Sequence, residues 1–301
     1  MPVPAGRRSI VRKMERRPFL VSAATVAAAP LVFGTGAPDA ADLIDTNVSL
    51  GDWPVRKSWV KSPADLVARL RRHGVTAAWT ASFEGVLHSD LAGANARLAE
   101  TCRGDGTGLL VPFGTVNPTL PDWADDVRRC HEVHRMPGLR LYPSYHGYTL
   151  DDARLARLLE AASRRGLLVQ IALTLEDERS QNPALTAPAL TAAPLPGLLA
   201  TVPTARVQLL NATSRLLAPT NPLLTRLADL GVGVELATLE GVAGLEGLLA
   251  KVPALRIAFG SHTPYFYFEA ALLKLQESAL TPAQLLAVRS GHARQLLATR
   301  S

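Results

Sequence analysis

One pattern recurs from Ala41 onward and limits what this chain can fold into. A short apolar run rich in β-branched residues is followed by an amphipathic stretch of helical length, eight times in succession. The runs are 43–50, 75–82, 109–116, 138–143, 167–173, 205–211, 232–238 and 255–261. Strands that alternate with helices predict a parallel sheet. Eight repeats predict that the sheet closes into a (β/α)8 barrel, with an open doubly wound sheet as the alternative.

The segments between the runs have the patterning of helices. Residues 63–74, 151–166 and 220–231 are amphipathic, and each ends in a glycine, which suits a helix C-terminus. Residues 281–297 predict one more helix packed on the barrel, and the Pro- and Leu-rich stretch 182–204 predicts a loop followed by the fifth helix. No stretch has the composition of a linker, so we expect one barrel domain over residues 41–301.

The first 40 residues have the layout of an export signal. Arg16 and Arg17 precede an apolar run from Phe19 to Phe33, and small residues then lead to Ala37. Paired arginines at such a boundary are typical of a cleaved twin-arginine signal peptide. The alternative is a membrane anchor, although the run is short for a membrane span. We therefore expect a periplasmic or extracellular protein with no stable membrane anchor after cleavage of residues 1–40.

Composition and charge exclude some classes of protein. The chain is 48% apolar and 19% charged, which supports a folded core and not disorder. Its net charge is +6, but residues 1–40 hold six basic and two acidic residues, so the predicted domain is only weakly basic. Without a basic stripe, nucleic acid is not an expected partner. The two cysteines, Cys102 and Cys130, leave one disulfide open as a possibility and do not form a disulfide framework.

Five segments of the predicted domain carry a family resemblance. They are LIDTNVSLGDWP (43–54), FGTVNPTLPDW (113–123), GLRLYPSYHGYTLDD (138–152), FGSHTPYFYFEAALLKL (259–275) and SGHARQLL (290–297). Together they resemble the amidohydrolase-related (amidohydrolase 2) branch of the metal-dependent amidohydrolase barrels. That branch also contains sugar-acid lactonases and decarboxylases. The resemblance implies a barrel whose active site lies at the C-terminal ends of the strands.

The sequence departs from this family where the metal ligands are expected. Members that bind a metal have His-x-His at the end of the first strand, and the matching residues here are Asn47 and Ser49. The histidines of the fifth and sixth strands match Ala172 and Asn211, and the aspartate of the eighth matches His262. Amides are weak neutral ligands. We therefore expect no catalytic metal and no other cofactor, with a metal in an unusual site as the alternative.

Other polar residues near the predicted strand ends complete the candidate site. Strand alternation places Asn47 and Ser49 on one inward face. The remaining candidates for substrate binding are Tyr142, His146, Gln170, Glu176, Arg179 and Glu235. Such a mouth suits a small polar substrate, neutral or anionic, such as a sugar acid, because Arg140 or Arg179 could hold a carboxylate through two hydrogen bonds. The plainer interpretations are that His146 orders a neighbouring tyrosine and that Glu176 belongs to a solvated acidic turn.

His262 is the expected general base. It matches the position of the family's proton-transfer group, and imidazole titrates near neutral pH. In this hypothesis His262 activates water, while Arg140 or Asn211 stabilises the oxyanion formed from an ester, lactone or amide. Two alternatives remain: His262 only satisfies a hydrogen bond left by the lost metal site, or Arg140 is a buried structural partner of Glu235 or another acid.

Two functions from different classes follow. The first is an exported, metal-independent hydrolase acting on a small sugar-acid-like substrate. The second is a catalytically inactive barrel that serves as a periplasmic binding or assembly protein. Association into a homo-oligomer is compatible with either.

Overall fold

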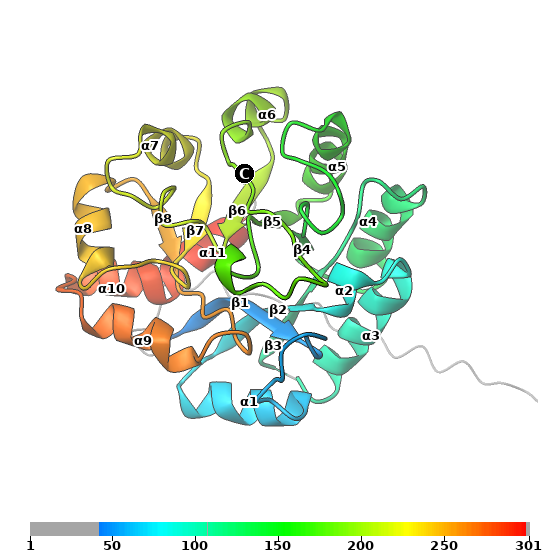
Figure 1. Ribbon diagram of the computed structural model, residues 1–301, viewed down its shortest axis with the longest axis horizontal. Coiled ribbons are helices and arrows are strands. Elements are labelled where there is room, and N and C mark those ends of the chain that lie inside the picture. The colour runs from blue at the N-terminus through cyan, green and yellow to red at the C-terminus, as the bar shows by residue number, and fades with distance from the viewer. Residues whose placement is uncertain (1–41, 107, 299–301) are drawn as a thin grey trace, which may run out of the picture. The chain divides into compact units, whose positions relative to one another are not determined.

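The computed structural model describes residues 42–106 and 108–298, and its centre is one ring of parallel strands (Figure 1). The strands follow chain order around the ring, each paired with the next. They are β1 (Ile44–Leu50), β2 (Ala77–Ser82), β3 (Leu110–Gly114), β4 (Gly138–Leu141), β5 (Leu168–Ala172), β6 (Arg206–Leu210), β7 (Gly233–Glu235) and β8 (Arg256–Ala258). The predicted (β/α)8 barrel is therefore confirmed.

The ring closes where β1 meets the segment that follows β8. The backbone N–H of Thr46 donates to the carbonyl of Phe259 at 2.9 Å, and that of Ser49 donates to the carbonyl of Thr263 at 2.8 Å. These bonds bring the loops after β1 and β8 to the same side of the mouth, although their residues are some 200 positions apart in the chain.

A bulge in β1 alters which of its side chains enter the barrel. The register of β1 against β2 shifts between Asp45 and Val48. An extra residue of this kind breaks strict alternation. The successive side chains of Thr46 and Asn47 both bond to residues across the barrel, Thr46 to Gln208 and Asn47 to Asn211. Simple alternation, which predicts Asn47 inside, does not predict Thr46 beside it.

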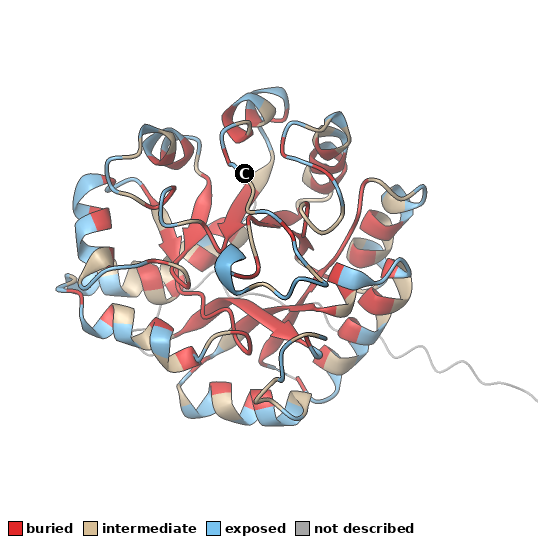
Figure 2. Ribbon diagram, in the orientation of Figure 1, coloured by how far each residue is buried: buried red, intermediate tan, exposed pale blue. Residues whose placement is uncertain are grey.

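Helices surround the ring and present one face to it. They are α1 (Pro63–Arg72), α2 (Glu84–Leu87), α3 (Leu91–Arg103), α4 (Trp123–Glu132), α5 (Ala153–Ser163), α6 (Leu195–Thr201), α7 (Pro222–Asp229), α8 (Gly244–Lys251) and α9 (Phe268–Gln276). Figure 2 shows buried strands inside helices whose outer faces are exposed. Gly74, Gly166 and Gly231, the predicted helix ends, all have positive φ values.

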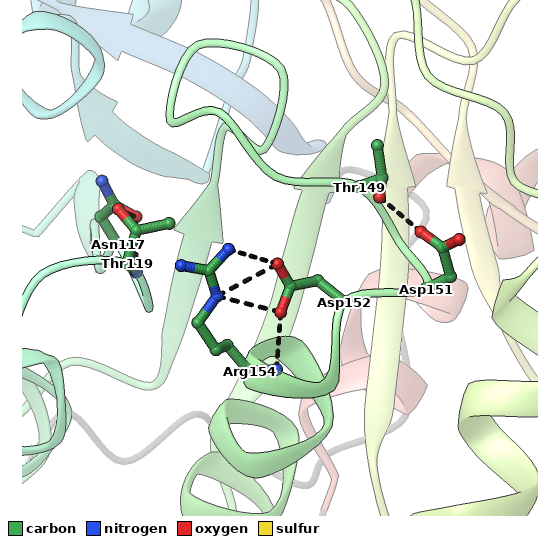
Figure 3. A network of polar contacts seen from close by, with 6 residues as sticks. All are labelled: Asn117, Thr119, Thr149, Asp151, Asp152 and Arg154. Atoms are coloured by element: carbon green, nitrogen blue, oxygen red, sulfur yellow. Dashed lines mark hydrogen bonds and ion pairs between the residues drawn. The ribbon is translucent and has the colours of Figure 1, made fainter.

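Figure 3 shows how the loop after β4 enters α5. The carboxylate of Asp152 accepts the backbone N–H of Arg154 at 2.8 Å and also pairs with its guanidinium at 2.6 Å. Just before it, the hydroxyl of Thr149 bonds to Asp151. A carboxylate at a helix start satisfies an otherwise free backbone donor. This anchor fixes the end of the loop that carries Tyr142 and His146.

The amino-terminal end of the barrel, here called the floor, is apolar. Its buried residues are Ile44, Trp79, Val111, Phe113 and Leu168, with Ala293 and Leu296 of α11. The rings of Trp79 and Phe113 stack at 5.1 Å. The predicted helix 281–297 is three pieces, α10 (Pro282–Leu286), the π-turn η2 (Ala287–Gly291) and α11 (His292–Leu297), and α11 closes the floor.

Several predicted strands end earlier than the sequence pattern indicates. The runs 232–238 and 255–261 form strands of only three residues each. The apolar runs continue beyond Glu235 and Ala258, but there the backbone no longer pairs with a neighbouring strand and forms the loops of the mouth. Alternating or apolar composition does not distinguish a paired strand from a buried loop.

The predicted signal peptide, residues 1–40, lies outside the described residues. Within the described residues, no helix has both the length and the apolar character needed to span a bilayer. Cys102 and Cys130 are both buried free thiols, and burial raises the pKa of each to about 12. The disulfide that the sequence left open is therefore not formed in this structure.

Candidate active site

Eight of the predicted site residues lie together inside the carboxyl-terminal end of the barrel. We call them the central cluster: Asn47, Ser49, Arg140, Tyr142, Gln170, Asn211, Glu235 and His262. None of them is more than 2% exposed. Strand periodicity and the rule that active sites follow strand ends selected Arg140, Tyr142, Gln170 and Glu235, and the family resemblance selected Asn47, Ser49, Asn211 and His262. Their complete enclosure was not predicted.

The guanidinium of Arg140 lies across the middle of the barrel. Its Nε donates to Gln170 at 2.8 Å, its Nη1 to the Val48 carbonyl at 2.8 Å, and its Nη2 to the carbonyls of Trp79 and Thr46 at 2.9 and 3.2 Å. Burial lowers the pKa of Arg140, and nearby acids oppose that shift. Because its donors point to the barrel wall, Arg140 is not free to hold an oxyanion in this structure.

Two glutamines continue this layer across the barrel. Gln170 Nε2 donates to the Thr46 carbonyl at 2.7 Å and to Gln208 Oε1 at 2.8 Å. Gln208 Nε2 in turn donates to the Thr46 hydroxyl at 3.0 Å. Sequence reasoning missed Gln208. Its place directly opposite Gln170 in the β5–β6 register, three residues before Asn211, is the signal that could have found it.

Asn47, Asn211 and Glu235 form a second group nearer the mouth. Asn47 Nδ2 donates to Asn211 Oδ1 at 2.8 Å, and the backbone N–H of Asn211 donates to Glu235 Oε1 at 2.7 Å. Glu235 Oε2 accepts the backbone N–H of Ala237 at 2.5 Å. Burial raises the pKa of Glu235 to about 7, against the effect of these donors. Asp45, bonded to Ser261 below, likewise has its pKa raised to about 6 by burial.

His262 is held as a neutral imidazole. Its Nε2 lies 3.0 Å from the carbonyl of Leu175, so Nε2 carries the proton and Nδ1 is left with a lone pair. Nδ1 is buried and has no hydrogen-bond partner. Burial lowers the pKa of His262 to about 4, and the charges of Arg140 and Arg56 add to that effect. The residue therefore stays neutral at pH 7.

Two of the four non-glycine residues with positive φ in the described part of the chain lie at these strand ends. His262 and Asn211 have φ values of 56° and 49°, in the left-handed region that non-glycine residues avoid. Each such residue costs on the order of 1 kcal/mol or more and persists only where the surroundings enforce it. Strained residues within a buried polar cluster are typical of functional sites.

The residues at the family's metal positions do not fit a metal ion. Of Asn47, Ser49, Ala172, Asn211 and His262, one is an imidazole and none is a carboxylate. The amide oxygens of Asn47 and Asn211 already face Arg140 Nη1 and Asn47 Nδ2, at 3.4 and 2.8 Å. A fixed guanidinium beside a donor set opposes a divalent cation. Across residues 42–106 and 108–298, no group of three or more His, Cys, Asp or Glu side chains could hold a metal.

Next to the central cluster lies a cavity of about 290 Å³, here called the rim pocket. It is lined by Trp53, Arg56, Lys57, Ser58, Trp59, Phe83, Pro264, Tyr265 and Tyr267. Most of these residues follow β1 and β8, so barrel closure brings them together. Arg56 lies 4.4 Å over the ring of Tyr265, and Trp59 stacks on Tyr267 at 6.2 Å. Sequence reasoning missed this pocket, although its aromatic and basic residues directly follow the first and last strands.

The segment 174–190, here called the mouth loop, covers the central cluster. Figure 1 shows it crossing the centre of the view between β5 and α6. The carbonyl of Thr174 accepts Asn211 Nδ2 at 2.8 Å, and the carbonyl of Leu175 accepts His262 Nε2 at 3.0 Å. Glu176 Oε1 accepts the hydroxyl of Tyr265. The loop therefore bonds to both strained residues.

The other predicted residues occupy different surroundings. Arg179 is 88% exposed and pairs with Asp177 in its own loop, so the structure does not bring it to the cluster. His146 Nε2 bonds to the Gly85 carbonyl at 3.0 Å, with its ring near Tyr142. The Tyr142 hydroxyl lies near Arg140 and Ser49 but meets neither at hydrogen-bond geometry. Glu176 is only 4% exposed, so it is not part of a solvated turn.

Comparison with known proteins places this barrel in a family. A sequence model of the family described as amidohydrolase matches residues 52–275. No curated protein matches the chain. Among solved structures, 2,6-dihydroxybenzoate decarboxylase from Rhizobium is similar, with a TM-score of 0.65 and 12% identity over 85% of this chain and 98% of that one.

Two further structures show the same fold. 5-Carboxyvanillate decarboxylase from Novosphingobium aromaticivorans, with bound manganese and 3-methoxy-4-hydroxy-5-nitrobenzoic acid, has a TM-score of 0.64 and 13% identity over 85% of this chain and 96% of that one. Apo IDCase from Metarhizium anisopliae has a TM-score of 0.60 and 18% identity over 81% of this chain and 80% of that one. At these identities the likeness concerns the fold. The family match over most of the described barrel is the stronger finding, and the chain belongs to the amidohydrolase 2 family.

Proposed function

We propose that this protein is a metal-independent hydrolase that acts on a small carboxylate with a flat ring, with His262 as its base. The observation that carries the proposal is the position of Tyr265. This residue lines the rim pocket and also stacks on the His262 ring, with centroids 5.1 Å apart and planes at 25°. A ligand in the pocket is thus separated by one ring from an imidazole whose Nδ1 lone pair has no partner.

The lining of the rim pocket supports this class of ligand. Trp59, Tyr265 and Tyr267 give the pocket an aromatic lining, and Arg56 and Lys57 are exposed cations at its edge. Aromatic faces favour a flat ring, and cations favour a carboxylate. A volume of about 290 Å³ suits a molecule of one ring.

The comparisons support the same ligand class. One similar decarboxylase structure holds 2,6-dihydroxybenzoate, and another holds a nitrobenzoic acid. The sequence alone favoured a sugar acid, because the predicted mouth was polar. The polar side chains behind that expectation are enclosed, so the accessible surface favours a flat ring instead.

The proposed chemistry needs the mouth loop to move, together with the Tyr265 ring that bonds to it and separates the rim pocket from His262. The carbonyls of Thr174 and Leu175 bond Asn211 Nδ2 and His262 Nε2, so displacing the loop frees both side chains together. Water then loses a proton to His262 Nδ1 as its oxygen adds to the substrate carbonyl, and Asn211 Nδ2 donates to the oxyanion. The proton passes to the leaving oxygen or nitrogen as the ester, lactone or amide bond breaks. Arg140 acts as a positioning residue that supports Asn47 from below.

A second candidate is a binding protein without turnover. It is favoured by the engagement of Arg140 and by the closure of the whole central cluster. Aryl esters and lactones incubated with wild type and His262→Ala distinguish the two functions. Turnover by wild type alone, with equal benzoate binding by both proteins, supports the hydrolase. Benzoate binding with no turnover by wild type supports the binding protein and rules out the hydrolase.

We also propose that the protein is exported by the twin-arginine route. The motif at Arg16 and Arg17 supports this proposal. A variant with both residues changed to lysine should remain inside the cytoplasm of a bacterial host, with its apolar run intact. Export of that variant at the wild-type level would contradict the proposal.

A further inference from the structure

Glu176 stands apart from the acids beside it in the mouth loop. Asp177 and Glu178 are exposed, whereas Glu176 is 4% exposed. Its Oε1 accepts the hydroxyl of Tyr265, and its Oε2 is buried without a partner. A carboxylate turned inward, with one oxygen satisfied and one not, is an unfavourable arrangement for a loop that could expose it to water.

The groups around this carboxylate belong to the rim pocket. Tyr265 bonds to it, the indole of Trp53 lies beside it, and the charge of Arg56 acts on it. All three residues line the pocket. Arg56 is itself held over the Tyr265 ring, with its guanidinium carbon 4.4 Å from the ring centroid. A hydroxyl, an indole and a guanidinium that converge on one carboxylate form an anion subsite.

We propose that Glu176 is an internal occupant of the anion subsite of the rim pocket, and that the carboxylate of a ligand replaces it there. This inference rests on the proposed function in one respect, the carboxylate ligand. Two carboxylates cannot share one such subsite without a large electrostatic cost. A bound ligand therefore expels Glu176, and Glu176 lowers the apparent affinity for every ligand that must expel it.

Expulsion of Glu176 also acts on the central cluster. Thr174 and Leu175, the residues just before it, supply the carbonyls that bond to Asn211 and His262. Movement of Glu176 out of the subsite pulls on both bonds. Ligand binding at the rim is thus coupled to release of Asn211 Nδ2 and His262 Nε2, so the barrel interior opens when a carboxylate arrives and stays closed otherwise.

The test compares two glutamates of the same loop. Benzoate is titrated into wild type, Glu176→Gln and Glu178→Gln, with binding followed by calorimetry and by the fluorescence of Trp53 and Trp59. Glu178 is exposed, and its Oε1 accepts the Ala189 N–H at 2.6 Å, a bond that glutamine keeps. Both variants lose one negative charge from the loop. We expect about tenfold tighter binding for Glu176→Gln and the wild-type affinity for Glu178→Gln.

A second measurement follows the loop itself. Saturating benzoate should raise hydrogen exchange in residues 174–190 of wild type, while Glu176→Ala should show the raised exchange without ligand. Thermal melting of each variant confirms that it is folded.

The outcomes separate the two proposals. Equal benzoate affinity in wild type, Glu176→Gln and Glu176→Ala overturns the occupant role and leaves the proposed ligand class intact. No binding by any of these proteins overturns both. Benzoate binding by the Glu176 variants but not by wild type supports the occupant role and means that Glu176 blocks the subsite in the wild-type protein.

Discussion

The floor and the mouth of this barrel are built from the same eight strands, yet their buried side chains differ in polarity and in how many of their polar atoms are hydrogen-bonded. The floor is an apolar layer in which Trp79 stacks on Phe113 and α11 closes the end. At the mouth, buried polar atoms without partners gather in one place. They are Trp53 Nε1, Trp59 Nε1, Tyr142 OH, Tyr145 OH, His146 Nδ1, Tyr148 OH, Glu176 Oε2 and His262 Nδ1.

Native proteins rarely leave buried polar atoms unpaired, so such a concentration needs a reason. Trp79 Nε1 and Ser290 Oγ at the floor are also unpaired, but the left-handed residue at that end, Arg135 with a φ of 57°, is exposed and lies in the loop before β4. At the mouth, the left-handed residues Asn211 and His262 accompany the unpaired atoms. The comparison indicates that the floor holds the fold together, while the mouth is kept in a costly arrangement that a ligand can relieve.

Arg140 contacts residues of both the floor and the mouth, and its substitution should cause the largest loss of stability. Its guanidinium reaches the Trp79 carbonyl near the floor and Asn47 at the mouth. Arg140→Met leaves buried carbonyls and Gln170 without donors, which should lower the free energy of unfolding by about 3–5 kcal/mol. Urea unfolding at pH 7 measures this loss. A loss below about 1 kcal/mol would show that Arg140 is dispensable to the fold.

A floor substitution should lower stability and leave the mouth unchanged. Phe113→Ala removes a fully buried ring that stacks on Trp79, and such truncations cost about 3 kcal/mol. We expect urea unfolding to record this loss while the benzoate affinity of the folded protein stays at the wild-type value. A change in affinity beyond about twofold would mean that the two ends are coupled and that the comparison is too simple.

The sequence predicted the barrel and the residues of its central cluster. It did not predict how these residues bond to one another or that a pocket lies beside them, for physical reasons. Strand spacing and strand-end positions indicate Arg140, and the family resemblance indicates Asn47, Asn211 and His262, all without coordinates. The hydrogen bonds that commit Arg140 to the barrel wall depend on which carbonyls the β1 bulge turns inward, and no local pattern reports a bulge. The rim pocket depends on the contact between the loops after β1 and β8, which exists only once the ring has closed.

The pH dependence of stability should reveal the buried carboxylate of the central cluster, Glu235. Glu235 has an ordinary pKa of 4.5 and a folded pKa of about 7, raised by burial, while Lys274 lowers it and Asp45 raises it further. Between these values the folded state binds more protons than the unfolded state, so Glu235 makes stability fall as pH rises from about 4.5 to 7. The size is on the order of 3 kcal/mol.

Chemical unfolding of wild type and Glu235→Gln at pH 4.5 and pH 7 tests this slope. His262 acts in the opposite sense, because its folded pKa of about 4 lies below the ordinary 6.5 and its contribution is lost as pH falls through that range. The difference between the two proteins cancels the His262 contribution. Glu235→Gln should therefore gain on wild type as pH rises, and parallel curves would contradict the raised pKa.

The smallest expected change in stability comes from the left-handed backbone at the mouth. His262→Ala and His262→Gly remove the same imidazole, but only glycine adopts a φ of 56° without steric cost. The glycine variant should be the more stable of the two by about 1 kcal/mol. Ala200→Gly, at an exposed position in α6, is the matched control and should be destabilised by about 1 kcal/mol, the reverse order. Thermal melting of the four proteins measures both differences. If glycine were the less stable residue at position 262 as well, the left-handed backbone there would carry no strain, and the mouth would resemble the floor in this respect.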